Sequence, residues 1–145
     1  MAKDTYPHFI YIEFPANART AMACGLVTLD DGSLQLVIAG GFDLEIKEAV
    51  DSTLVFSYQD ASWRLGAPLP TPLNLASSVP YGNTFLVVGG DTAPAANEVK
   101  VVRDILEYYP EGAGDWILRA ERLEHPRADA LAFLVPSVAL DCRVK

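Results

Sequence analysis

Twice in this chain an apolar, strand-forming segment ends on a pair of glycines, and this repetition constrains its fold most. The pairs are Gly40-Gly41, after LQLVIA, and Gly89-Gly90, after TFLVV, and they lie 49 residues apart. Two tryptophans, Trp63 and Trp116, follow the pairs and lie 53 residues apart. A period of about 50 residues is typical of solenoids, propellers and arrays. The sequence therefore predicts one structural unit that occurs twice within 145 residues, the length of an ordinary domain.

Each unit contains four short segments with the composition of β-strands. In the first unit, two such segments flank Asp31-Gly32, a dipeptide typical of type I′ hairpin turns, in which both central residues have positive φ. Tyr81-Gly82-Asn83 takes that place in the second unit. A third strand is expected over 51–58 and a fourth around the tryptophan. Residues 97–109 fit a helix in part, but their alignment with 51–58 favours a strand, so each unit is predicted to be a four-stranded antiparallel meander.

Taken together, these features resemble the kelch repeat family, whose members fold as β-propellers. Each unit has the Gly-Gly pair, an aromatic residue in the third strand (Tyr58, and Tyr108 or Tyr109), and Trp63 or Trp116 in the fourth. A segment rich in leucine and proline then follows. The resemblance covers two full repeats and partial ones at each end, nearly the whole chain. It implies that the glycines allow a sharp turn and close backbone approach, and that the aromatic residues fill the wedge between blades while their OH or NH finds a partner.

The resemblance implies an all-β fold class with kelch-type β-propeller blades, each a four-stranded antiparallel meander. We expect one segment, 1–145, with blade A over about 21–69 and blade B over about 76–123. Residues 6–15 are expected to join 128–145 in a partial blade. A propeller has about four to eight blades, so these are too few for a complete ring. Open blade faces leave three alternatives: further blades from a longer chain, self-association into a homo-oligomer, or an open array.

The sequence contains no pattern typical of a catalytic or metal centre. His8 and His125 lack a second histidine or a carboxylate at ligand spacing, and no serine lies in a GxSxG motif. Cys24 and Cys142 are expected to be packed side chains, with a disulfide between them as the alternative. We therefore expect no catalytic residues, no metal and no cofactor, and we expect that the chain is not an enzyme.

The charge balance narrows the class of partner. The chain has 11 basic and 19 acidic side chains, a net charge of −8, which argues against binding to nucleic acid or an anionic membrane. No apolar run approaches the roughly 20 residues that cross a bilayer. The N-terminal residues lack the apolar region of a signal peptide, which slightly favours a cytoplasmic protein and leaves an extracellular one open.

Two long loops between the second and third strands are the candidate binding surface. The first carries Glu45, Lys47 and Glu48, and the second carries Lys100 and Arg103. Long loops on a rigid scaffold often carry recognition, and in kelch propellers they commonly lie on a ligand-facing rim. The resemblance thus implies a non-catalytic protein–protein interaction module with a protein partner that the sequence does not identify. The alternative is a carbohydrate-binding or enzymatic propeller fragment, similar to the galactose oxidases, which bind copper through Tyr and His.

Overall fold

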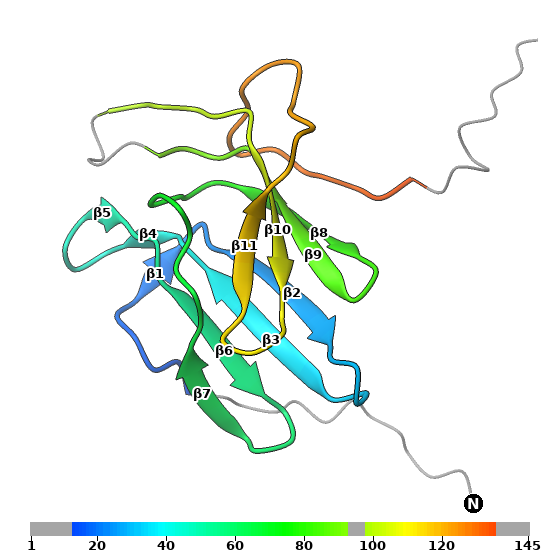
Figure 1. Ribbon diagram of the computed structural model, residues 1–145. Helices are drawn as coiled ribbons and strands as arrows, with labels where there is room; N and C mark the ends of the chain where they lie inside the picture. Colours follow the sequence, from blue (N-terminus) through cyan, green and yellow to red (C-terminus); the bar gives the residue numbers. More distant parts are fainter. Residues whose placement is uncertain (1–12, 93–97, 136–145) are drawn as a thin grey trace, which may run out of the picture.

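The computed structural model describes residues 13–92 and 98–135 of the chain. Within these ranges every regular element is a β-strand, and the strands form three antiparallel sheets (Figure 1). Two of the sheets are four-stranded meanders, and the third is a small sheet of three short strands. The predicted all-β fold built from blade-like four-stranded meanders is confirmed, and the described strands do not close into a ring.

The first sheet is a meander interrupted by a short insertion. Its strands, in spatial order, are β2 (Ala23–Thr28), β3 (Leu34–Ala39), β6 (Thr53–Ser57) and β7 (Ser62–Leu65). At the β2–β3 turn, the amide of Gly32 donates to the carbonyl of Leu29 and that of Leu29 to the carbonyl of Ser33, both at 2.9 Å. Gly32 has a φ of +82°, whereas Asp31 does not have a positive φ. The turn is therefore a three-residue loop with a glycine bulge, and the expected type I′ geometry was wrong.

The second sheet repeats the meander. Its strands, in chain order, are β8 (Ser77–Tyr81), β9 (Thr84–Val88), β10 (Ile105–Tyr109) and β11 (Asp115–Leu118). Gly82, with a φ of +59°, is the first of the two turn residues between β8 and β9, and Asn83 does not share its positive φ. Glycine at that position is typical of a type II′ turn, which suits the twist of a hairpin. Of residues 98–109, those that form a regular strand make up β10, as the alignment of the units predicted.

The third sheet has two of its three strands in residues 42–50, where the sequence predicted a plain loop. It consists of β1 (Arg19–Thr20), β4 (Phe42–Asp43) and β5 (Glu48–Ala49), with β4 in the middle. The first long loop is therefore a short hairpin that begins directly after the first Gly-Gly pair.

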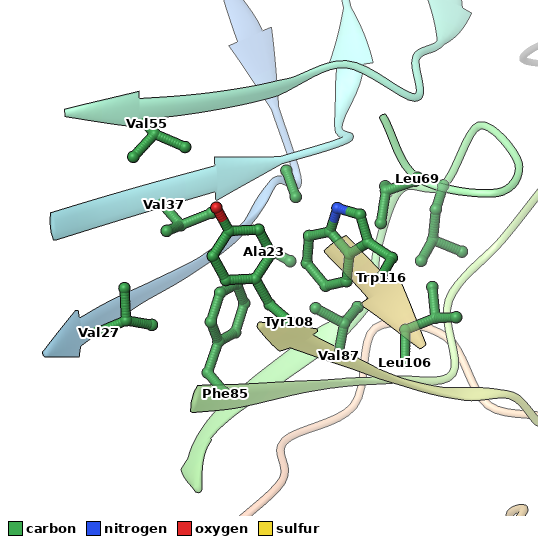
Figure 2. Close-up of a cluster of buried hydrophobic side chains, with 12 residues drawn as sticks. Ala23, Val27, Val37, Val55, Leu69, Phe85, Val87, Leu106, Tyr108 and Trp116 are labelled. Carbon is green, nitrogen blue, oxygen red and sulfur yellow. The ribbon is translucent and has the colours of Figure 1, made fainter. Parts of the chain in front are cut away.

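The two large sheets pack face to face, and their joint is the hydrophobic core. Strand β2 of the first sheet lies against β8 and β9 of the second. Aliphatic side chains of the first sheet meet aromatic side chains of the second, as Figure 2 shows. The fully buried members of this core are Val27, Val37, Val55, Phe85, Val87 and Tyr108. Burying each such side chain contributes about 1.5–3 kcal/mol, so the joint is a main source of stability.

Two close contacts fix the distance between the sheets. A Cβ atom at Gly25 would lie 2.7 Å from the ring of Phe85, so the ring packs directly on the backbone of β2. The indole Nε1 of Trp116 donates to the Thr53 hydroxyl of β6 and to the carbonyl of Ala67, which follows β7, both at 3.1 Å. Trp116 therefore fills the wedge between the sheets and has its NH satisfied there.

The repeat is visible in the backbone hydrogen bonds as well as in the strands. The amide of Gly41 donates to the carbonyl of Leu73 at 2.8 Å, and that of Gly90 donates to the carbonyl of Arg127 at 2.7 Å. The two acceptors are 54 residues apart. Each Gly-Gly pair thus turns the chain against the connector that follows its own sheet.

The strand register assigns the third-strand aromatic residues differently from the sequence alignment. Phe56 lies opposite Trp63, and Tyr108 lies opposite Trp116, so Phe56 and not Tyr58 corresponds to Tyr108. Tyr58 follows the end of β6 and touches Phe56 edge-on, with the ring centroids 5.3 Å apart.

The hydroxyl of Tyr108 departs from the expectation that every polar tip finds a partner. It is buried and makes no hydrogen bond of ordinary geometry. Burial raises the pKa of Tyr108, and the nearby Arg64 guanidinium offsets part of that rise. The side chain therefore serves the core chiefly through its ring.

Candidate functional site

The two candidate loops start from a common base at one end of the sheets. The carbonyl of Leu73 accepts from the amide of Gly41, at the foot of the β4–β5 hairpin. The next residue, Asn74, exchanges two backbone hydrogen bonds with Asp91, at the foot of the second loop (3.0 and 2.8 Å). In Figure 1 both loops lie at the upper left. We call this surface, residues 42–49, 91–92 and 98–103, the rim.

Asp43 holds the hairpin in shape. Its buried carboxylate accepts from the amides of Glu45 at 2.8 Å and Ile46 at 3.2 Å, and from the Asn17 side chain at 3.3 Å. Burial acts to raise the pKa of Asp43, but these hydrogen bonds and the charge of Arg19 outweigh it and hold that pKa below its ordinary value of 3.8. A carboxylate that accepts backbone N–H groups in this way stabilises a tight turn in one geometry.

The hairpin presents two apolar side chains to solvent. Leu44 and Ile46 are each more than half exposed, and the predicted site residues Glu45, Lys47 and Glu48 alternate with them or follow them. The three charged residues were predicted from the sequence as site residues, and the two apolar residues were not. The signal that would have found them is the pattern DLEI, in which an aspartate suited to start a turn precedes two apolar residues separated by a charged one.

The second loop contributes Lys100 and Arg103, both exposed. The amide of Lys100 donates to the Asp91 carboxylate at 2.8 Å, and its carbonyl accepts from the amide of Thr92 at 3.0 Å. The backbone of the loop is therefore tied at its base, next to the hairpin. Within the described residues, none of the five charged candidates forms an ion pair, so their charges face solvent.

A mostly apolar cleft of about 220 Å³ opens beside the rim. Leu73, whose backbone carbonyl accepts from the hairpin, lines it together with Leu106 and Leu118 of the second sheet. Asp104 supplies a carboxylate to the lining and is paired with Arg122 at 3.5 Å. The cleft and the hairpin together give this end of the chain both a projecting and a recessed apolar feature.

The residues that could support metal or thiol chemistry do not converge. Over 13–92 and 98–135, no three His, Cys, Asp or Glu side chains lie close enough to hold a metal ion. His125 is exposed beside Glu124, and His8 lies outside the described residues. Cys24 is exposed on β2, so the expectation that it is packed was wrong, and Cys142 lies outside the described residues. The described residues contain no helix that is long and apolar enough to cross a membrane.

No family model matches the chain. No curated protein matches it either. Among solved structures, the chain is similar to the structure of YjhT, with a TM-score of 0.60 and 17% sequence identity. The matched region covers 85% of this chain and 33% of that one, so the chain spans about a third of that protein's length. At this identity the similarity shows the fold alone. Together with the observed sheets, it places the chain in the class of all-β proteins built of blade-like meanders.

The depressed pKa of Asp43 predicts how the stability of the hairpin depends on pH. A carboxyl group whose pKa is lower in the folded state contributes stability above its unfolded pKa, about 3.9, and loses it as the pH falls through the folded value. We expect Asp43→Asn to be less stable than the wild type at pH 7, and the difference to shrink below about pH 4. Urea unfolding of both proteins from pH 7 to pH 3 measures it. A difference that stays constant over that range would mean that the carboxylate charge contributes nothing.

Proposed function

We propose that the chain is a non-catalytic protein-interaction module built of kelch-type propeller blades, with the rim as its binding surface. The observation that carries the proposal is the exposed pair Leu44 and Ile46 on a hairpin held in one geometry by Asp43. When a partner binds an apolar pair on a preorganised turn, little conformational entropy is lost, because the backbone of the turn is already ordered.

The surroundings of the pair favour a protein as the ligand. Protein interfaces have an apolar centre inside a polar, solvated border, and the exposed Glu45, Lys47 and Glu48 of the same hairpin supply such a border here. The cleft beside Leu73 offers a recess for an apolar side chain of the partner. The net charge of −8 does not suit a polyanion.

The kelch part of the proposal is supported by how the repeated residues are used. Gly40 and Gly89 both have a φ of +64°, and each lies against the backbone of a following connector. Trp63 and Trp116 occupy corresponding register positions on the last strand of each sheet. Glycines that permit a turn and tryptophans at matching places are what the family's packing requires.

Affinity capture with a matched pair of variants tests the binding surface. The immobilised wild-type chain is expected to retain one protein in stoichiometric amount, and the double variant Leu44→Asp, Ile46→Asp is expected to retain about 30-fold less. The control is Leu34→Asp, which adds a charge at a similarly exposed leucine at the opposite end of β3 and is expected to bind normally.

Two results would contradict the proposal. A partner retained equally by the double variant and by the wild type would place the binding surface away from the rim. A glycan array that gives a specific signal with the wild type, in the absence of any protein partner, would favour the carbohydrate-binding alternative instead.

A further inference from the structure

The joint, that is, the interface between the two large sheets, shows which positions of a sheet contact its neighbour. On the first sheet, Ala23 and Val27 of β2 point into the joint and are buried, and Gly25 between them receives the ring of Phe85. On the second sheet, Phe85 and Val87 of β9 fill the other side. Because the two sheets are repeats, the residues that correspond to these interface positions can be identified in the C-terminal segment and on the outer face of the first sheet.

The first strand of each large sheet, β2 or β8, is called its innermost strand. At the C-terminal end, residues 130–135 occupy the position that the innermost strand of a further sheet would have. Three residues with positive φ, Ala21, Leu75 and Asp129, precede the successive innermost segments at a spacing of 54 residues. The amide of Leu75 donates to the carbonyl of Ala21 at 3.1 Å, and that of Asp129 repeats this bond to Leu75 at 2.9 Å. The amide of Ala132 then donates to the Ser77 hydroxyl of β8 at 2.7 Å. In Figure 1 this segment is the orange-to-red part of the chain.

The side chains of this segment that correspond to the joint are uncovered. Applying the 54-residue spacing twice to Ala23, Gly25 and Val27 gives Leu131, Phe133 and Val135. Ala23 and Val27 are buried, whereas all three C-terminal residues are at least half exposed, and Phe133 is 78% exposed. Among residues 13–92 and 98–135, nothing covers this side of the interface.

The outer face of the first sheet presents the complementary side. By strand register, Leu36 and Ile38 of β3 correspond to Phe85 and Val87 of β9. Phe85 is 0% exposed in the joint, whereas Leu36 and Ile38 are only half-buried.

One contact of a joint already exists on this outer face. Trp63 Nε1 donates to the Glu13 carbonyl at 2.8 Å, just as Trp116 Nε1 donates to the Ala67 carbonyl at 3.1 Å. Glu13 and Ala67 are 54 residues apart. The ring of Phe14 also packs edge-on against Trp63, with the centroids 5.8 Å apart. The outer face thus has the polar contact of such an interface, and the described part of the chain leaves Leu36 and Ile38 only half-buried there.

We propose that a second copy of this chain supplies the missing half, so that residues 131–135 of one copy pack on Leu36 and Ile38 of the other. The side-chain sizes are complementary. Inside the chain a large ring, Phe85, packs on Gly25, and between copies the large ring would be Phe133 and the smaller partner Leu36. Within the chain, β2 is the strand of the first sheet that contacts β8 and β9 of the second sheet. One extended segment, such as residues 131–135, can therefore supply the closest contact between two copies.

This contact is heterologous, because it joins different surfaces of the two copies. Every copy carries both surfaces, so two copies form two equivalent contacts if the rotation closes, and a longer chain of copies forms if it does not. The contact uses the outer face and the C-terminal segment and leaves the rim free. It therefore stands or fails independently of the proposed rim function.

Sedimentation equilibrium over a concentration series tests the contact. The wild-type chain is expected to self-associate to at least twice the mass of one chain. Phe133→Asp is expected to weaken association about 30-fold, and because the side chain is exposed in a single chain, it should fold normally. Ile46→Asp, on the rim, is the control and is expected to associate like the wild type. A wild-type chain that stays monomeric, or a Phe133→Asp chain that associates normally, would overturn the proposal.

Mixing two variants separates this contact from a symmetric one. Leu36→Glu alters the outer face and should also weaken association. Circular dichroism shows whether this variant folds, and Ile38→Glu is used in its place if Leu36→Glu does not fold. An equimolar mixture of Phe133→Asp and Leu36→Glu retains one intact contact per pair and is expected to recover part of the association. If Leu36→Glu dissociates the copies while Phe133→Asp does not, the outer faces pair with each other and the proposed arrangement is wrong.

Discussion

Replacing Gly89 with alanine is expected to lower the free energy of unfolding by about 3 kcal/mol. The left-handed backbone conformation costs an alanine about 1–2 kcal/mol, and the overpacking caused by the added Cβ atom costs about as much. Gly89 has a φ of +64°, and a Cβ atom there would lie 2.3 Å from the carbonyl oxygen of Arg127. The obstacle is backbone, which cannot rotate away as a side chain can. The loss should appear in urea unfolding followed by circular dichroism.

Gly32→Ala separates the two causes. Gly32 also has a positive φ, +82°, but no atom lies within 4 Å of the position where its Cβ would be. Its loss is therefore expected to be only the conformational cost, about 1–2 kcal/mol. Equal losses at the two positions would show that the close approach of the Arg127 carbonyl does not constrain Gly89, and that the Gly-Gly pair is needed for its φ alone.

The meanders could be predicted because each signal for them is local. An apolar, β-branched segment, a turn containing glycine and a tryptophan-bearing last strand are all written within one unit, and the structure places strands at each. The β4–β5 hairpin could not be predicted in that way. It depends on the Asp43 side chain and on pairing with β1, whose residues Arg19–Thr20 lie more than 20 positions earlier. The strand propensities of residues 42–50 include neither the Asp43 hydrogen bonds nor the pairing with β1.

The equivalence of aromatic residues failed for a related reason. The spacing between the two units is 54 residues at the innermost strands, 49 at the glycines, 52 at the third strands and 53 at the tryptophans. Because loops of different length separate the strands, no single period aligns all positions. Only the hydrogen-bonded register shows that Phe56 stands where Tyr108 does. The exposed pair on the rim was missed because apolar residues in loops carry no periodic signal.

The two tryptophans should differ in energetic importance although they occupy corresponding positions. Trp116 is buried in the joint, and Trp116→Ala is expected to cost about 4 kcal/mol, as for other large-to-small changes in a core. Trp63 is half-buried on the outer face, where Phe14 and the Glu13 carbonyl are its contacts from the N-terminal residues. Trp63→Ala is expected to cost about half as much, since the loss scales with the apolar area that leaves water.

The comparison is made by urea unfolding in the Phe133→Asp background, so that association between copies does not contribute. There the loss at Trp116 should exceed the loss at Trp63 by about 2 kcal/mol. In the unsubstituted chain at high concentration the loss at Trp63 should grow, because covering the outer face buries more of its indole. Equal losses in the Phe133→Asp background would mean that residues 13–14 already complete the outer face, and that a second sheet has nothing further to cover there.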